Sequence, residues 1–322
     1  MTASTLPGRP RPESGVRPGR FVLRRPTRPV GAEPLPLERG LGIDYDTSWA
    51  RRYPVRLARA MLLDDVTRPL LRMTCAPTVH GLEHLDPLEA PVILAGNHSS
   101  HVDTALLLSC LPMRLRHRSV VAAAADYFFD RRWKSTVWAF VLGAIPMERT
   151  KVNRRSADLA AELIGEGWSL LIFPEGGRSP DGWGQEFKGG AAYLAKRCSV
   201  PVVPVHIRGT RAISAKGSAK LRPGSTELRF GDALWPQADE DARHFAARIE
   251  RAVALLADEA ETDWWSARRR AALGTTPPYR GPDASPWRRA WALPPSADPT
   301  PRRSTRRSKG GRSAGWPRER TD

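Results

Sequence analysis

The sequence contains few cysteines, and their spacing fits neither a disulfide framework nor a metal site. Cys75, Cys110 and Cys198 are the three cysteines of a 322-residue chain, an odd number set far apart. A disulfide-rich secreted domain and a structural zinc site are therefore excluded, and reduced, buried thiols are expected. Histidines and carboxylates form no cluster with metal-ligand spacing either, so we expect an activity that uses no metal and no cofactor.

Long apolar runs are also missing from the sequence. The longest apolar-looking run, residues 135–147, is too short to span a bilayer, and no apolar stretch near Met1 resembles a secretory signal. We therefore expect a location at the cytoplasmic face of a membrane, with peripheral contact only. With 41% hydrophobic residues, the chain still has enough apolar content for one large domain or two small ones.

Acidic residues are scarce only toward the two ends of the chain. The formal net charge is +17. Residues 1–40 carry eight arginines against three acidic residues, and residues 266–322 carry fourteen basic residues against four acidic ones. The segment between these ends is close to neutral, with a net charge of +2. The excess charge therefore belongs to the ends of the chain.

Both end segments are rich in proline, glycine and serine. They bury too little apolar area to offset the entropy of an ordered chain, so residues 1–40 and 266–322 are predicted to be disordered basic tails. Such tails bind nucleic acid or an anionic membrane surface, or they remain solvated without a partner. Their arginines are interleaved with only scattered tryptophan, which argues against nucleic acid because no stacking platform forms.

Residues 41–76 are predicted to form an amphipathic helical segment. Arginines alternate with leucine, alanine and methionine at helical spacing between residues 50 and 75, and Pro54 and Pro69 interrupt the pattern. This favours one or two short basic helices. They either lie in a lipid interface or pack on the neighbouring domain.

Residues 77–265 alternate between strand-like and helix-like segments. Apolar runs such as 91–96 and 169–173 are each followed by a helical pattern, and a long helix is expected to close the segment. This order predicts an α/β fold, a single domain with a mostly parallel or mixed central sheet flanked by helices. Open α/β sheets bind ligands outside the carboxyl ends of their strands, so the loops after the strands are the candidate sites.

The loop after the strand at 91–96 reads NHSSHVD and holds two histidines and an aspartate. Ser100 and Asp103 fit a helix-capping box, which leaves Asn97 and His98 unexplained. A histidine at the strand end and a carboxylate in the first helical turn can meet, and the carboxylate then orients the imidazole. An imidazole held in this way acts as a general base toward a hydroxyl nucleophile.

Three further motifs follow along the chain. GAIPMER places Arg149 after an apolar run, and FPEGGRS places Glu175, Gly176, Gly177 and Arg178 after a strand. The glycines allow close approach of the backbone to a ligand, and arginine presents a planar fork suited to phosphate oxygens. The last motif, VPVVPV, is interpreted as a buried strand broken by two prolines. Each of these motifs alone is typical of an ordinary turn or packing feature.

Taken together, the motifs closely resemble those of the glycerolipid acyltransferases of the lysophosphatidic acid acyltransferase type. That family carries N-H-x-x-x-x-D, G-x-I-x-x-x-R, F-P-E-G-T-R-S and a final V-P-x-x-P-V strand. The resemblance extends over residues 77–232, about half of the chain. It implies the transfer of a fatty acyl group from acyl-CoA or acyl-carrier protein to the hydroxyl of a lysophospholipid, foremost 1-acylglycerol-3-phosphate, in phospholipid synthesis.

The resemblance also implies a role for each candidate residue. His98 is the general base and Asp103 is its orienting partner, while His101 lies in the variable part of the motif. The arginines of the acceptor site hold the acceptor's phosphate. The residues implied to shape this site are Asn97, Arg149, Glu175, Gly176, Gly177 and Arg178.

The sequence departs from the family pattern at two places. Gly177 replaces the usual threonine, and alanines at 122–125 stand where many members carry a lysine before an aromatic pair. The loss of that cation leaves open a different lipid acceptor. Two other classes of function also compete, a nucleic-acid-binding protein acting through its tails and a lipid-binding protein without catalysis. The His98–Asp103 pair argues against the second, because binding alone needs no such pair.

Overall fold

The computed structural model of the protein describes residues 42–148, 154–214, 222–281, 284 and 288. The basic tail predicted at residues 1–40 lies outside the described residues, as does most of the tail predicted at 266–322. Arg149, implied to contact the acceptor's phosphate, also lies outside them.

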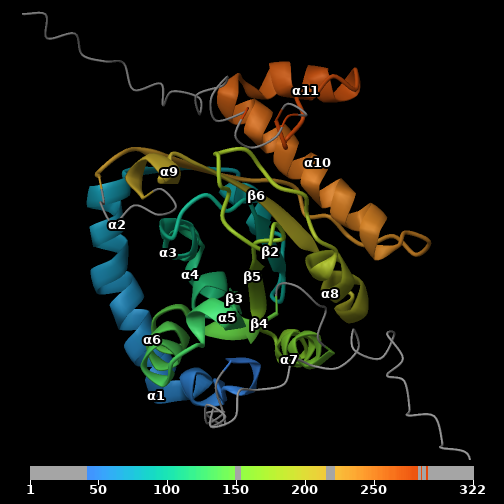
Figure 1. Cartoon of the computed structure of the whole chain (residues 1–322). Helices are drawn as coiled ribbons and strands as arrows, with labels where there is room; N and C mark the ends of the chain where they lie inside the picture. Colours follow the sequence, from blue (N-terminus) through green and yellow to red (C-terminus); the bar gives the residue numbers. More distant parts are fainter. Residues whose placement is uncertain (1–41, 149–153, 215–221, 282–283, 285–287, 289–322) are drawn as a thin grey trace, which may run out of the picture. The chain divides into compact units, whose positions relative to one another are not determined.

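A seven-stranded mixed sheet forms the centre of the domain (Figure 1). Its order is β1-β7-β6-β2-β5-β3-β4, and all neighbouring pairs are parallel except β6 and β7. The predicted α/β fold with a mostly parallel or mixed sheet is confirmed. The strands are β1 (Pro77–His80), β2 (Ile93–Gly96), β3 (Ser119–Ala124), β4 (Ala144–Met147), β5 (Ser169–Ile172), β6 (Val202–Arg208) and β7 (Thr226–Phe230).

Two layers of helices cover the two faces of this sheet. Ile93 and Ala95 of β2 pack in one hydrophobic core and Leu94 in the other, since successive side chains of a strand point to opposite faces. This burial on both faces explains why β2 is apolar throughout. One layer contains α7 (Arg154–Gly165), α8 (Gly190–Cys198) and α10 (Ala242–Glu261). The other contains α2 (Arg68–Cys75), α3 (Val102–Cys110) and α4 (Met113–Arg116).

Shorter helices complete the described part of the chain. α6 packs beside β4 at one edge of the sheet, and α11 packs against α10. The remaining α-helices are α1 (Tyr53–Met61), α5 (Ala125–Phe128), α6 (Arg132–Leu142), α9 (Thr210–Ile213) and α11 (Trp264–Ala272). The 3-10 turns are η2 (Gly42–Asp44), η3 (Ser48–Arg51) and η5 (Leu82–Leu85).

Helices α1 and α2 are joined into one continuous segment by a π-helical turn, η4 (Leu62–Thr67). Pro54 lies in the first turn of α1, where the missing N–H has no helical partner to lose. Pro69 follows the π-helical turn, whose wider winding accommodates a residue that donates no backbone hydrogen bond. The two prolines therefore do not divide the segment.

Strand β6 is continuous, so the expectation that its prolines break the strand is wrong. Val202 pairs with Leu234 and Val205 pairs with Phe230, which leaves one more residue on the partner side than on β6 between the two pairs. Pro204 lies in this irregular stretch, and its carbonyl accepts the N–H of Gly231 at 2.9 Å. A proline fits there because the bulge removes the need for its N–H.

The ordered domain extends beyond residue 265, so the tail boundary predicted at residue 266 is wrong. Helix α11 begins after Asp263, whose carboxylate accepts the N–H of Ser266 at 2.9 Å. Arg270 then donates two hydrogen bonds, of 2.7 and 2.5 Å, to the buried carboxylate of Asp258 on α10. The basic residues at the start of the expected tail are therefore partly used to dock a helix.

Candidate active site

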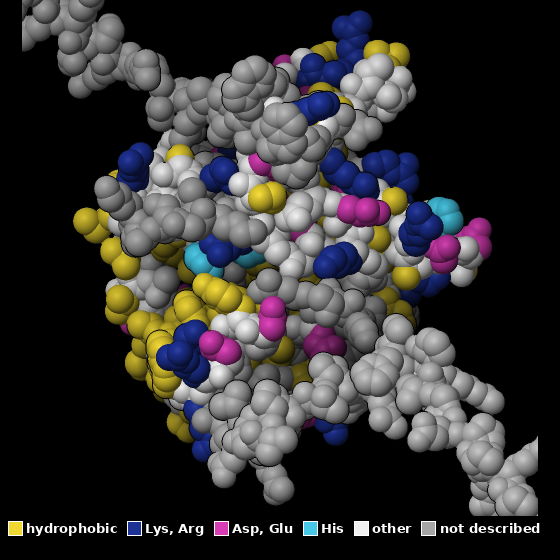
Figure 2. Space-filling view, viewed as in Figure 1, with side chains coloured by type: hydrophobic (Ala, Val, Ile, Leu, Met, Phe, Trp, Pro, Cys, Tyr) yellow, Lys and Arg dark blue, Asp and Glu magenta, His cyan; other side chains and the backbone are white. Residues whose placement is uncertain are grey.

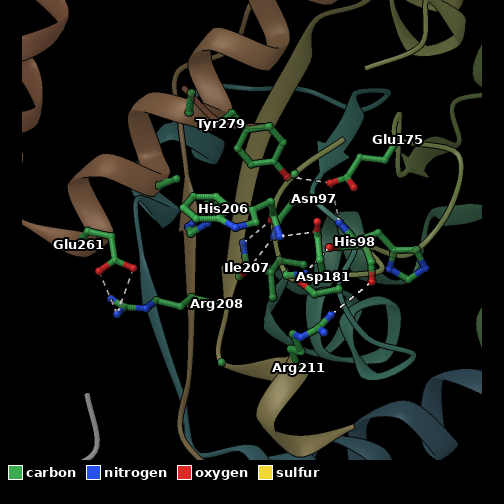
Figure 3. Close-up of a pocket in the computed structure, with 18 of the residues that line it drawn as sticks. Asn97, His98, Glu175, Asp181, His206, Ile207, Arg208, Arg211, Glu261 and Tyr279 are labelled. Carbon is green, nitrogen blue, oxygen red and sulfur yellow. Dashed lines mark hydrogen bonds and ion pairs between the residues drawn. The ribbon is translucent and has the colours of Figure 1, made fainter. Parts of the chain in front are cut away.

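The candidate site lies where three neighbouring strands end. His98 follows β2, Glu175 follows β5, and Arg208 is the last residue of β6, with β2 between the other two strands. A cavity of about 780 Å³ opens at this edge, and both His98 and Glu175 line it. Figure 3 shows that Tyr279 and Arg211 reach the same cavity from other parts of the chain. The strand order thus gathers the site from distant segments, as open α/β sheets do.

His98 and Asp103 form a hydrogen-bonded pair. Nδ1 of His98 lies 2.9 Å from Oδ2 of Asp103, and the carboxylate is fully buried. The same oxygen accepts the backbone N–H groups of Ser99 at 2.7 Å and Ser100 at 2.8 Å. Asp103 is therefore held in one position at the start of α3, and it holds the imidazole in turn.

This pairing determines which ring nitrogen of His98 is available for chemistry. A carboxylate at Nδ1 favours the tautomer with the proton on Nδ1, which leaves the lone pair on Nε2. The ring stacks on Phe173 with 4.2 Å between centroids, and 15% of the side chain is exposed. The histidine is thus oriented from two sides while still accessible from the cavity.

Asn97 links two strands at the base of the site. Its Nδ2 donates to the carbonyl of Ile207 at 2.8 Å, and its Oδ1 accepts the N–H of Ile207 at 2.7 Å. The amide thereby extends the hydrogen bonding between β2 and β6 beyond the last backbone pair, Gly96 with Val205. Asn97 also lines the cavity, and its two hydrogen bonds to Ile207 fix the strand end that precedes His98.

Glu175 is almost fully buried, at 4% exposure, and it contacts the backbone of the loop that carries His98. Its Oε1 accepts the N–H of His98 at 3.1 Å and the hydroxyl of Tyr279 at 2.7 Å. Its Oε2 accepts the backbone and side-chain N–H groups of Gln185, at 3.3 and 3.4 Å. Ser179 adds a hydrogen bond of 2.8 Å to the carbonyl of His98. The FPEGGRS loop therefore forms hydrogen bonds with both the backbone N–H and the backbone carbonyl of His98.

Burial changes the acidity of this carboxyl group. It raises the pKa of Glu175 from 4.5 to about 7, although hydrogen bonds from Tyr279, His98 and Gln185 act in the opposite direction. Burial also raises the pKa of Tyr279 well above 10, and the adjacent Glu175 raises it further. The tyrosine therefore stays a hydroxyl donor throughout the range in which the carboxyl titrates.

Ser179 of the FPEGGRS motif also lines the cavity, whereas Gly176, Gly177 and Arg178 do not. Gly176 has a left-handed φ of 73°, and a Cβ at this position would lie 2.6 Å from Nζ of Lys188, so the turn requires glycine. A Cβ at Gly177 would meet nothing within 4 Å, so its place accommodates a larger side chain. Arg178 lies near His101, whose pKa is lowered first by burial and then by the charge of Arg178.

The second histidine of the motif has different surroundings. His101 stacks on Tyr127 with 5.9 Å between ring centroids, and its Nε2 lies 3.5 Å from the tyrosine hydroxyl. The hydrogen bond of Asp103 goes to His98 instead. This geometry favours His98 over His101 as the base.

Several residues at the site were not identified from the sequence. Tyr279, Gln185 and Arg211 all contact the loops that hold His98 and Glu175. Arg211 donates to the carbonyls of Ser179 and Pro180 at 3.4 and 3.2 Å. Tyr279 was assigned to a tail because its neighbours are proline, glycine and arginine; the one local signal was an aromatic residue after two prolines.

A buried carboxylate that orients a histidine at the end of a central strand defines a site for base-assisted attack by a hydroxyl or water. The acyltransferase family model matches residues 76–208, the segment that contains this pair. The resemblance stated from the four motifs is confirmed.

Among curated relatives, the 1-acyl-sn-glycerol-3-phosphate acyltransferase of Chlamydomonas reinhardtii is 31% identical over 177 residues, covering 53% of this chain and 50% of the relative. The chloroplastic enzyme of that name from Brassica napus is 32% identical over 148 residues, covering 44% of this chain and 39% of the relative. The alpha form from Homo sapiens is 24% identical over 193 residues, covering 58% and 65%. The chain spans about half the length, or less, of the first two relatives.

A solved structure has the same fold. The crystal structure of the 1-acyl-sn-glycerophosphate acyltransferase PlsC from Thermotoga maritima matches with a TM-score of 0.52 at 24% identity. The match covers 68% of this chain and 84% of the other. It supports the sheet and helix arrangement described above.

Proposed function

We propose that this protein transfers a fatty acyl group from a thioester to the hydroxyl of 1-acylglycerol-3-phosphate in phospholipid synthesis. The observation that carries the proposal is the His98–Asp103 pair, with 2.9 Å between Nδ1 and Oδ2, inside the segment that matches the acyltransferase family. The choice of acceptor follows the names of the curated relatives, which are 1-acyl-sn-glycerol-3-phosphate acyltransferases. The donor is acyl-CoA or acyl-carrier protein, which share the same thioester.

The chemistry follows from the orientation of His98. The acceptor's hydroxyl oxygen attacks the thioester carbonyl while Nε2 of His98 takes the hydroxyl proton. The buried carboxylate of Asp103 stabilises the imidazolium that forms. Collapse of the tetrahedral intermediate breaks the carbon–sulfur bond, and the proton returns from His98 to the thiolate. A thioester is already activated, so a positioned base and proximity suffice without a covalent enzyme intermediate.

Recognition of the acceptor's phosphate is proposed for Arg178, together with Arg149. We expect Arg178→Lys to lower kcat/KM for 1-acylglycerol-3-phosphate by about 1–3 kcal/mol, because lysine keeps the charge but loses the two parallel hydrogen bonds of a guanidinium. The measurement is kcat/KM on this acceptor and on a monoacylglycerol without phosphate. Arg178→Lys should narrow the difference between the two acceptors.

The same comparison in the wild type tests the identity of the acceptor. A wild-type enzyme that prefers 1-acylglycerol-3-phosphate supports the proposal. If it uses the phosphate-free lipid as well or better, the acceptor is a different lipid and Arg178 has another role.

We further propose that the protein binds the membrane peripherally through an exposed apolar surface. The helical segment 53–75 exposes a stripe of large apolar side chains, each 44–82% exposed, and α6 adds Trp133 and Val137. Figure 2 shows apolar side chains gathered on the face formed by these helices. The stripe consists of Tyr53, Leu57, Met61, Val66, Leu70 and Met73. No helix among the described residues is long and apolar enough to cross a bilayer.

Substitutions in this stripe should weaken membrane binding. We expect Leu70→Asp with Met73→Asp to lower affinity for anionic vesicles at least about tenfold, since each side chain loses about 1.5–3 kcal/mol of apolar burial. Vesicle co-sedimentation measures the effect. Leu273→Asp is the control, because this leucine lies outside the stripe and its exposure falls between those of Leu70 and Met73. Equal binding of all three proteins would assign membrane contact to another surface, such as the basic ends.

A further inference from the structure

A segment near the C-terminus, residues 275–281, packs against the candidate site although it lies far outside residues 76–208. Pro277, Pro278 and Tyr279 line the same cavity as His98. The Tyr279 ring meets Phe187 edge-on, with 5.8 Å between centroids and 84° between planes. The segment therefore forms one wall of the site.

The ring of Tyr279 packs closely against Gly184. The N–H of Gly184 donates to the carbonyl of Tyr279 at 3.3 Å, and a Cβ at Gly184 would overlap the Tyr279 ring. On the next residue, Arg280 donates two hydrogen bonds, of 2.7 and 3.0 Å, to the Glu250 carboxylate on α10. The tyrosine is thus fixed by packing on one side and by a bidentate ion pair on the other.

We propose that Tyr279 is a positioning residue for acyl transfer, fixing the Glu175 carboxylate that in turn holds the backbone of His98. The inference rests on the proposed function. Its basis is one shared atom, Oε1 of Glu175, which accepts both the Tyr279 hydroxyl and the His98 N–H. Figure 3 shows the hydroxyl directed at the carboxylate.

The contribution of Tyr279 depends on the charge of Glu175. The ionised carboxylate accepts hydrogen bonds at both oxygens. When Glu175 is protonated, one oxygen carries a proton and becomes a donor, so fewer lone pairs remain to accept hydrogen bonds. Protonation of Glu175 therefore loosens the contact with His98. The Tyr279 hydroxyl opposes this protonation, because a hydrogen bond to the charged form favours that form.

Other charged groups surround this pair and stay in place when the hydroxyl is removed. Asp103 and Glu250 both act on Tyr279 through their negative charge, and His98 lies between Asp103 and Glu175. Lys188 approaches the turn at Gly176, directly after Glu175. A change in pH dependence on removing the Tyr279 hydroxyl alone therefore reports on its hydrogen bond to Glu175.

The test is Tyr279→Phe in the full-length protein, which removes the hydroxyl and keeps the ring. We expect kcat for transfer from acyl-CoA to 1-acylglycerol-3-phosphate to fall about 10- to 100-fold, the effect of losing a hydrogen bond to a charged group. The acidic limb of the kcat–pH profile should also move to higher pH, since Glu175 becomes easier to protonate. Tyr193→Phe, which alters an exposed tyrosine of α8, should leave both unchanged.

A second variant displaces the ring without altering the hydroxyl. Gly184→Ala should lower kcat and move the acidic limb in the same direction, whereas Gly190→Ala, where a Cβ meets nothing within 4 Å, should do neither. An acidic limb that stays at its wild-type position in Tyr279→Phe overturns the inference, whatever the change in kcat. A wild-type protein that transfers no acyl group overturns the proposed function. An active wild type with an unshifted acidic limb in Tyr279→Phe overturns only the inference about Tyr279.

Discussion

The His98→Ala variant should lose acyl transfer by a factor on the order of 10² to 10⁴, which is the usual contribution of a positioned general base. The alanine removes Nε2, the atom proposed to take the proton of the acceptor's hydroxyl. The N–H groups of Ser99 and Ser100 still donate to Asp103 in this variant, so the conformation of the loop should be preserved. Steady-state rates of thiol release with saturating acceptor measure the loss, and acceptor binding should survive.

His101→Ala is the matched control for this variant. It removes a histidine three residues away that stacks on Tyr127. The Asp103 carboxylate accepts its hydrogen bond from His98 instead. We expect its rate to stay near that of the wild type. Full activity in His98→Ala, with loss in His101→Ala instead, would reverse the assignment of the base.

Glu175 should lower the stability of the protein as the pH rises from about 4.5 to about 7. Its pKa is about 7 in the folded protein, raised from 4.5 by burial. Below pH 4.5 the carboxyl is protonated in both states and imposes no penalty. Above pH 7 it is charged in both states, and the folded state is less stable by about 3 kcal/mol.

Glu175→Gln removes this titration. The free energy of unfolding, measured by denaturant titration, should decline from pH 5 to pH 8 by about 2.5 kcal/mol less in the variant than in the wild type. Any change in stability that the glutamine side chain causes independently of pH is the same at both pH values, so it drops out of this comparison. An identical decline in both proteins would mean that Glu175 titrates near its ordinary value.

The fold could be predicted because its signals are local. β2 and β5 are apolar on both faces, and each is followed by a helical pattern, which specifies a covered parallel sheet without knowledge of distant contacts. The His98–Asp103 pair was predictable for the same reason, since five residues between a strand end and a helix start bring the two side chains together.

The parts that could not be predicted depend on contacts between distant segments. Pro204 looked like a strand breaker until its position in a bulge was known. Tyr279 bonds to Glu175, 104 residues earlier in the chain, and its own neighbours resemble a tail. The hydrogen bonds between Asn97 and Ile207 join residues 110 positions apart, so no local pattern shows them.

The most direct test of the central claim is to follow both products of the proposed reaction with the wild-type protein. Purified enzyme, acyl-CoA and 1-acylglycerol-3-phosphate are incubated, and free thiol and phosphatidic acid are quantified together. The account predicts that both products accumulate in equal amounts, only when the acceptor is present, and that His98→Ala forms neither at a comparable rate. Thiol release that is independent of the acceptor, without phosphatidic acid, would contradict it.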